Sequence, residues 1–446
     1  MKKILIFLLI SSGVVWGQEA RKISADEAVQ LAIRNNLSLT STRIDTGIKQ
    51  RKQQFAWNSF IPTVQANGTL SRPNEATAFM PGVDPGSPQW TLSGSLQFTL
   101  NLNVALFEAM KTLRLDYQGG VISYEKAKAQ LERDIRKAYY NMILLQENIK
   151  LLKENQAAAN SRVQTAQANY RAGTAPQLNY LQAQVAAENL RPTIAQSENG
   201  LKLSMAQFAM YLGLPFDTQF ELTPISGSLN FIPLDLHDLI RQSTGKKPEI
   251  LELRNSILLM QSTRKRTALQ MYTPTLSLGW GLSPSFGGLW GESLFNGDMW
   301  SEGGRFTLTL SFGLNSLFPF GSEKQGLNDL DDNLRTLTLG LSQMVNGVEI
   351  EIYNTVLSLE HIRESAEAQA RTVSLAQQSY SLTNQAYRSG FSDLMEVQNA
   401  ELELRKAQVG MIEQQYNYLN GLIDLEYSIG VPFGTLSKQV LEGEVQ

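Results

Sequence analysis

The sequence contains no cysteine and only two histidines, His237 and His361. Without cysteine the chain forms no disulfide framework and no thiolate zinc site. Two histidines far apart in the sequence do not supply the several convergent ligands that a zinc or iron centre needs. We therefore expect no metal and no other cofactor, and we interpret both histidines as ordinary solvated or core residues.

A strong charge of either sign is also lacking. The 39 basic and 42 acidic side chains give a net charge of -3, which leaves no electrostatic signature of nucleic-acid binding. The sequence carries no nucleophile elbow, no Gly-rich phosphate loop, no metal-ligand spacing and no paired catalytic carboxylates. These absences predict a protein that is not an enzyme and has no nucleic-acid partner.

Long apolar runs are missing as well, apart from a short one at the N-terminus. Residues 1–17 have the pattern of a signal peptide, in which Lys2 and Lys3 precede the apolar run 4–10 and small residues lead to a predicted cleavage after Gly17. This run is too short to cross a bilayer, and no stretch of about 18 apolar residues follows it. The sequence predicts an exported chain without a transmembrane helix.

Three short motifs occur twice, in the same order. The pairs are 60–64 with 272–276, 170–173 with 387–390, and 212–215 with 429–432. The offset is 212 positions for the first pair and 217 for the other two. This period far exceeds that of short-repeat solenoids and indicates a duplicated half-molecule. The predicted organisation is a signal peptide (1–17), a first repeat (18–215), a linker (216–235), a second repeat (236–432) and a C-terminal tail (433–446).

Each repeat contains two segments in which apolar and small polar residues alternate strictly. The four segments are 62–72, 91–102, 274–283 and 305–316. Period two over about ten residues is typical of strands in membrane barrels, and about 9–11 residues are needed to cross a bilayer at a tilt. A soluble sandwich with one buried face would also alternate, so it remains an alternative.

Four strands do not close a barrel. An open sheet edge leaves backbone groups unsatisfied in lipid, so other copies of the chain must complete the wall. Two copies would give about eight strands, whose interior is filled by side chains, whereas three would give about twelve and leave a passage. The strand count therefore predicts a homotrimer whose wall is in contact with membrane lipid.

A helical stretch precedes each strand pair, and a long helical hairpin follows it. The hairpins are predicted at 121–212 and 341–429. In the first, apolar residues recur at spacings of four and three from Leu131 to Leu152, which indicates a left-handed coiled coil. Pro192 predicts a kink in the returning helix. A structural or adhesive surface protein with a coiled-coil stalk would share these helices and is the alternative function.

The full order of these features resembles the TolC-like outer-membrane efflux proteins. It consists of a strand pair, a long helix, Tyr-Arg-x-Gly at a turn, a returning helix and Gly-x-Pro, all given twice. The resemblance implies a membrane α+β fold: a trimer in which four strands per chain form a shared twelve-stranded outer-membrane barrel, with a periplasmic α-barrel of coiled-coil helices. It also implies the exit duct of a tripartite efflux pump or type I secretion system. Such a duct passively conducts drugs, small toxicants or proteins.

The resemblance also implies partners and sites. The hairpin tips would dock a periplasmic adaptor (a membrane fusion protein), which connects to an inner-membrane transporter. The candidate docking residues are Tyr170, Arg171, Gly173, Thr174, Tyr387, Arg388, Gly390 and Phe391. A ring of carboxylates just inside the second tip would constrict the pore, and the candidates are Glu396, Asp393 and Asn399. Glu396 falls at the first ring position and Asn399 where a second carboxylate is often found.

Overall fold

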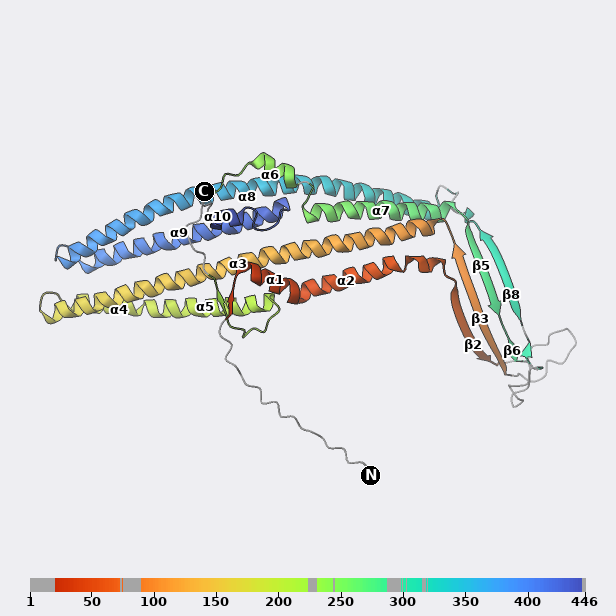
Figure 1. Ribbon diagram of the computed structural model, residues 1–446, viewed down its shortest axis with the longest axis horizontal. Coiled ribbons are helices and arrows are strands. Elements are labelled where there is room, and N and C mark those ends of the chain that lie inside the picture. Colours follow the sequence, from red (N-terminus) through yellow and green to blue (C-terminus); the bar gives the residue numbers. More distant parts are fainter. Residues whose placement is uncertain are drawn as a thin grey trace, which may run out of the picture. The chain divides into compact units, whose positions relative to one another are not determined.

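The computed structural model describes residues 21–72, 74, 90–223, 231–243, 245–286, 298, 300–301, 303–314, 318 and 320–442. The predicted signal peptide lies outside the described residues, as do most of the loop between the first two strands and the last four residues of the tail. The chain divides into two compact units, and each unit takes segments from both repeats (Figure 1). The first comprises Met1–Ser41, Glu125–Lys247 and Asn346–Gln446, and the second comprises Thr42–Tyr124 and Pro248–Val345.

The second unit contains an antiparallel sheet in the order β2-β3-β5-β8. Its strands are β2 (Thr63–Ser71), β3 (Thr91–Leu102), β5 (Thr275–Leu282) and β8 (Gly304–Ser311). The first three lie within the predicted segments 62–72, 91–102 and 274–283, whereas β8 begins one residue before the predicted segment 305–316 and ends five residues before its end. Their alternation places every second side chain on the same face of the sheet. Two short strands follow β5 in the chain, β6 (Ser285–Phe286) and β7 (Trp300–Ser301). β6 pairs with β3, and β7 pairs with β6. The connection between β5 and β8 is thus partly paired.

The register of the sheet collects the apolar residues on one face. Phe98 lies opposite Trp280, and Trp280 lies opposite Phe306 in the next strand. The rings of Phe98 and Trp280 have centroids 5.2 Å apart. Phe306 is 68% exposed and Leu308 is 62% exposed. This face therefore lacks the cover that a soluble sandwich would give it, which argues against that alternative.

The helices of the second unit approach one another closely at glycines. They are α2 (Leu37–Gln54), the 3-10 turn η1 (Ala56–Phe60), α7 (Pro248–Tyr272) and the first parts of α3 (Ala105–Arg171) and α8 (Ser322–Arg388). A Cβ on Gly120 would lie 3.6 Å from the Cα of Thr46, and one on Gly119 would lie 2.7 Å from the side chain of Asn255. The glycines thus make room for α2 and α7 beside α3.

Both long helices start earlier than we predicted. The expected starts were residues 121 and 341, just after glycines, whereas α3 begins at Ala105 and α8 at Ser322. A glycine inside a helix costs only about 1 kcal/mol relative to alanine. At Gly119 and Gly120 close packing of the neighbouring helices offsets that cost, so these two glycines do not end α3. A Cβ on Gly340 would meet nothing within 4 Å, so packing does not explain why α8 continues through that glycine. Each of the two helices has 67 residues.

The first unit contains the returning helices and the main core. Its other elements are β1 (Arg21–Ile23), α1 (Ala25–Asn35), α4 (Gln177–Glu188), α5 (Leu190–Tyr211), β4 (Phe220–Leu222), α6 (Leu236–Ser243), α9 (Leu394–Ile429) and α10 (Ser437–Glu442). The boundary between α4 and α5 lies at Asn189, three residues before Pro192. The proline ring clashes with the carbonyl four residues earlier, which explains the position of the break.

The N-terminal segment is fastened to α3 by a buried tyrosine. β1 pairs in parallel with β4, and the hydroxyl of Tyr139 on α3 donates to the carbonyl of Ile23 at 2.9 Å. The N–H of Thr223 donates to the same hydroxyl at 3.0 Å. Ser24 and Glu27 form a capping box at the start of α1.

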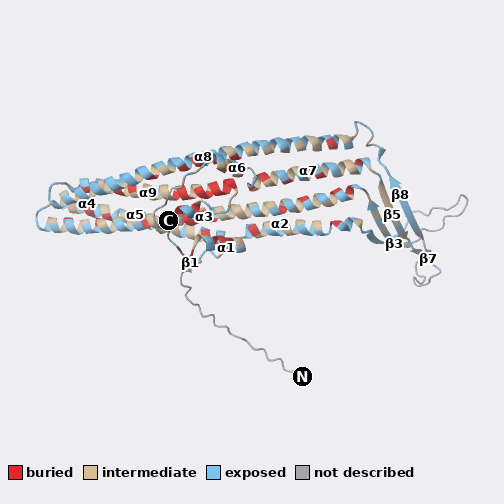
Figure 2. Ribbon diagram, turned by 45° about the horizontal axis from the view of Figure 1, so that its top comes forward, coloured by how far each residue is buried: buried red, intermediate tan, exposed pale blue. Residues whose placement is uncertain are grey.

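Buried residues gather in the C-terminal half of α9, as Figure 2 shows in red. Leu419, Leu422 and Ile423 are fully buried there. Leu419 and Ile423 share a core cluster with Ile135 and Phe208. None of the helices in the described part of the chain is long and apolar enough to cross a bilayer.

Candidate functional site: hairpin tips and the contacts behind them

Both hairpin tips are built on a glycine in the left-handed conformation. Gly173 follows α3 with φ 73°, and Gly390 follows α8 with φ 80°. The N–H of Thr174 donates to the carbonyl of Asn169 at 3.0 Å, and the N–H of Phe391 donates to that of Ala386 at 2.9 Å. This six-to-one bond is the Schellman pattern, which ends a helix and turns the chain at a residue without a Cβ.

The side chains at the tips are exposed. Arg171 and Arg388 form no ion pair with another described residue, and both lie in the last turn of their helix. Phe391 is 89% exposed and Tyr170 is 41% exposed. The tips therefore expose cationic and aromatic side chains. The remaining predicted docking residues of the first tip, Gly173 and Thr174, are exposed as well.

The second tip is anchored from behind by a small apolar cluster. Leu394, at the start of α9, is buried against Ala166 of α3 and Ala183 of α4. Tyr387 packs on this cluster, and its burial raises the pKa of the hydroxyl. Small alanine side chains let the helices approach closely. The two hairpins are thus in contact just inside their tips, and Tyr387 has a packing role there.

The three constriction candidates lie on one side of the first turns of α9. Asp393 caps the helix, because its Oδ1 accepts the N–H of Glu396 at 2.8 Å. The hydroxyl of Ser392 donates to the carboxylate of Glu396. Glu396 and Asn399 are exposed and three residues apart, so they share a face. Asp393 therefore serves the helix itself, while Glu396 and Asn399 present polar groups outward.

A pair that we did not predict joins the two hairpins. Arg162 on α3 forms an ion pair with Glu401 on α9, and the two side chains are 12% and 18% exposed. The pair borders an open groove of about 960 Å³ between helices α3, α5 and α9. Within this groove Nδ2 of Asn155 is buried and has no hydrogen-bond partner among the described residues. No local pattern marks Arg162 and Glu401 as partners, because they are 239 positions apart.

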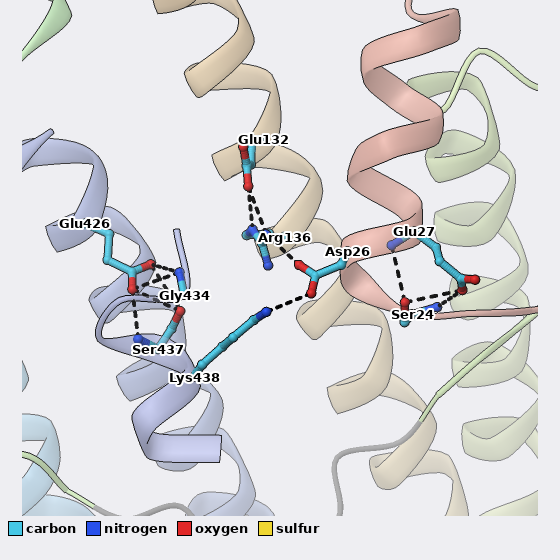
Figure 3. A network of polar contacts seen from close by, with 9 residues as sticks. All are labelled: Ser24, Asp26, Glu27, Glu132, Arg136, Glu426, Gly434, Ser437 and Lys438. Carbon is cyan, nitrogen blue, oxygen red and sulfur yellow. Dashed lines mark hydrogen bonds and ion pairs between the residues drawn. The ribbon is translucent and has the colours of Figure 1, made fainter. Parts of the chain in front are cut away.

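A second unpredicted network ties both ends of the described chain to α3 (Figure 3). Arg136, whose side chain is 8% exposed, contacts Asp26 of α1 at 2.7 Å and Glu132 at 2.9 Å. Lys438 of α10 contacts the other oxygen of Asp26 at 3.0 Å. Burial alone would raise the pKa of Asp26, but hydrogen bonds from Lys438 and Arg136 bring it below its usual value.

The tail is held by one fully buried carboxylate, that of Glu426 near the end of α9 (Figure 3). It accepts the backbone N–H groups of Gly434, Leu436 and Ser437 at 3.1, 2.6 and 2.9 Å, together with the hydroxyl of Ser437. A buried charge is stable only when it is well hydrogen-bonded, so the tail and Glu426 stabilise each other.

On α8, Glu351 makes a comparable link. Its carboxylate accepts from Lys247 at 2.6 Å and from the hydroxyl of Ser428 on α9 at 2.5 Å. Burial by itself would raise the pKa of Glu351, but these two hydrogen bonds and the charges of Lys247 and Arg133 lower it overall. No described group of three or more His, Asp or Glu side chains is placed to hold a metal ion.

Comparison with known proteins shows similarity to the outer membrane efflux proteins. The sequence profile of the Outer membrane efflux protein family matches residues 28–214. Outer membrane efflux protein BepC of Brucella suis is 21% identical over 418 residues, which are 92% of this chain and 86% of that protein. Nodulation protein T of Rhizobium leguminosarum is 21% identical over 328 residues, which are 71% of this chain and 66% of that protein.

The fold agrees with this similarity. The crystal structure of the outer membrane protein VceC of Vibrio cholerae superposes with a TM-score of 0.74 at 14% identity, over 92% of this chain and 96% of that one. The predicted resemblance to the TolC-like outer-membrane efflux proteins is confirmed, and so is the predicted TolC-like fold of the single chain.

Proposed function

We propose, from the similarity of this chain to the outer-membrane efflux proteins, that it forms the outer-membrane exit duct of a tripartite efflux pump or type I secretion system. The duct conducts drugs, small toxicants or proteins passively. The strands lie in the outer membrane and the long helices reach into the periplasm. No residue performs a chemical step, so function depends on the shape, charge and assembly of the passage.

One observation carries the proposal: the sheet has an exposed apolar face and two free edges. Among the described residues β2 pairs only with β3, and β8 pairs only with β5. Unpaired strand edges are not tolerated in hydrocarbon, so the edges must meet those of other copies. With four main strands per chain, three copies close a barrel of about twelve strands, which leaves a water-filled lumen.

The hairpin tips dock the periplasmic adaptor in this proposal. Exposed Arg171, Arg388 and Phe391 support it, because arginine and aromatic side chains are enriched in protein interfaces. The adaptor connects the duct to an inner-membrane transporter. Binding of the adaptor shifts the population of hairpin positions toward an open passage.

Glu396 forms the constricting ring in this proposal. Threefold symmetry brings three copies of its exposed carboxylate around one axis, and a ring of carboxylates favours cations. We expect Glu396→Gln to lower the cation selectivity of single channels in a planar bilayer. Glu403→Gln is the matched control, since Glu403 is an exposed carboxylate farther along α9. Unchanged selectivity and conductance in Glu396→Gln would remove the ring from the proposal.

The function itself is tested on the purified protein and on a deletion strain. The protein should run as a trimer in mild detergent and pass ions in a planar bilayer. The deletion strain should become sensitive to drugs or lose secreted proteins, which separates efflux from secretion. A monomeric chain that passes no current would instead support a coiled-coil surface protein.

A further inference from the structure

The strands of the sheet contain a single charged residue among those described, Arg305 in β8. All other residues of these strands are apolar, glycine or neutral and polar. Arg305 is the second residue of β8, whose first residue pairs with Leu282 at the end of β5. The chain enters β5 at its other end, directly after α7. The charge therefore lies at the end of the sheet that is farther from the helices.

The register of the sheet places Arg305 on the polar face. Arg305 lies opposite Gly281 of β5, and Gly281 lies opposite Gln97 of β3. The next residue of each strand, such as Phe306 opposite Trp280, belongs to the apolar face. In the proposed duct the apolar face lies against lipid and the polar face lines the passage. Arg305 therefore belongs to the wall of the passage, near its outer end.

Gly281 leaves an open space between two hydrogen-bond donors. Neighbouring strands lie about 4.8 Å apart, so β3 and β8 are separated by about 10 Å across β5. Gly281 has no side chain to fill the gap between Gln97 and Arg305. The structure has an open pocket of about 500 Å³ here, whose lining includes these three residues and Thr307. None of the described residues that line the pocket is acidic.

The charge of Arg305 is not cancelled by the strands of a neighbouring copy. β8 and β2 are the two edges of the four-stranded sheet, so in the proposed ring β8 of one copy meets β2 of the next. β2 contains no acidic residue, and its polar face is formed by threonine, serine and amide side chains. Arginine keeps its charge in proteins. Whatever the register between copies, β2 supplies no carboxylate to Arg305.

We propose that this pocket is an anion site in the wall of the passage, which takes the carboxylate group of an organic anion. The inference rests on the proposed function and adds a class of compound that the passage favours. The planar guanidinium of Arg305 matches both oxygens of a carboxylate. The amide NH₂ of Gln97 is a second donor on the other side of Gly281. Three copies place three such sites around one passage.

The width of the passage decides how far the charge of Arg305 acts. About twelve strands, spaced about 4.8 Å apart and tilted by about 40°, form a wall with a radius of about 12 Å. The Debye length is about 10 Å in 0.1 M salt and about 3 Å in 1 M salt. Three Arg305 charges therefore act across the passage at low salt and only beside the wall at high salt. A ring of arginines favours anions.

Reversal potentials in KCl gradients across a planar bilayer test the charge. We expect R305Q to lower the permeability ratio of chloride to potassium by about twofold or more near 0.1 M salt, and to leave it unchanged near 1 M salt. R305K is the matched control, because lysine keeps the charge, and it should retain the ratio of the unsubstituted protein. Glu396 is present in all three proteins, so the comparison isolates Arg305.

A second measurement tests the fit of a carboxylate, with acetate as the probe. The reversal potential with acetate on one side and chloride on the other gives their permeability ratio. G281V fills the pocket and keeps the charge. A Cβ on Gly281 would lie 3.7 Å from Cγ of Gln97 and 3.8 Å from the carbonyl oxygen of Leu96, which are ordinary contacts, so the strand should accept it.

We expect G281V to lower the acetate-to-chloride ratio by about twofold, because the gap for the carboxylate is lost while the charge stays. Its chloride-to-potassium ratio should remain that of the unsubstituted protein. R305K should give the same two results, since an ammonium group lacks the planar fork that pairs with two oxygens. Agreement between these two variants would identify a fitted site, which a charge alone does not create.

The outcomes separate this inference from the function it rests on. If R305Q conducts as a trimer with an unchanged chloride-to-potassium ratio near 0.1 M salt, the anion site is wrong and the proposed function stands. If R305Q lowers that ratio but G281V and R305K keep the acetate-to-chloride ratio, Arg305 acts only as a charge and the carboxylate site is wrong. If the unsubstituted protein passes no current, the site and the proposed function are both wrong.

Discussion

The role of the buried Glu426 carboxylate in holding the C-terminal tail can be tested directly. It holds the C-terminal tail through three backbone N–H groups and one hydroxyl. We expect Glu426→Gln to loosen the tail while α9 stays helical, because glutamine keeps the size of the side chain and loses its charge. One carboxylate oxygen becomes an amide NH₂, which faces N–H groups that have no other acceptor among the described residues.

The magnitude follows from the bonds that weaken. A hydrogen bond to a charged group contributes about 1.5–3 kcal/mol. The glutamine amide retains one oxygen. We place this oxygen where it accepts the N–H groups of Leu436 and Ser437, so the hydrogen bond that weakens is the one from the Gly434 N–H. The free energy of local opening should fall by about 2 kcal/mol, which makes hydrogen exchange about 30-fold faster at these three amides.

Hydrogen–deuterium exchange measures this opening directly, since the amides that bind Glu426 report on the tail and those of the central α9 helix do not. Glu413→Gln is the matched control, because Glu413 lies on the same helix and is exposed. It should leave exchange of the tail unchanged. Equal exchange of the Gly434, Leu436 and Ser437 amides in Glu426→Gln and the unsubstituted protein would refute the reasoning.

Two further predictions concern stability. Gly213 and Gly173 share a positive φ, 70° and 73°, but a Cβ on Gly213 would lie 2.5 Å from the carbonyl oxygen of Asn35, whereas one on Gly173 meets open space. Gly173→Ala should cost about 1–2 kcal/mol of conformational energy and lower the thermal unfolding midpoint accordingly. Gly213→Ala should lower the midpoint at least twice as far as Gly173→Ala does. Equal shifts of the midpoint in the two variants would contradict the packing argument. The pKa of Glu351 is lowered from its usual 4.5, so its contribution is full above about pH 4.5 and is lost as the pH falls through the lowered pKa. The difference in unfolding midpoint between the protein and Glu351→Gln should therefore narrow below about pH 4, and a difference that persists there would exclude the pairing with Lys247.

Local patterns were sufficient for the strands and the tips. Period-two alternation and the motif Tyr-Arg-x-Gly depend on a few consecutive residues, so they can be recognised without knowing which other segments pack against them. The same local reading set the starts of the long helices too late, at residues 121 and 341. The glycines before these positions look like helix breakers in isolation, and only the neighbours of Gly119 and Gly120 explain why α3 continues through them.

The sequence placed the constriction candidates close together along the chain but did not predict their contacts. Asp393, Glu396 and Asn399 were expected as one group, and they do lie along one side of α9. Their local bonds, such as the cap that Asp393 provides, require backbone geometry. The ring and docking roles of these residues and of the tips stay predictions, because they depend on copies and partners outside the single chain.

By itself the sequence determined the doubled order of strands, long helices and glycine turns, since each of these arises from spacing along the chain. It also determined that no thiolate chemistry is available. Only the tertiary structure decided which of many similar polar residues are buried and paired, such as Glu426 with the tail and Arg162 with Glu401. The physical reason is that desolvation and ion pairing depend on distances between residues hundreds of positions apart, which no local pattern encodes.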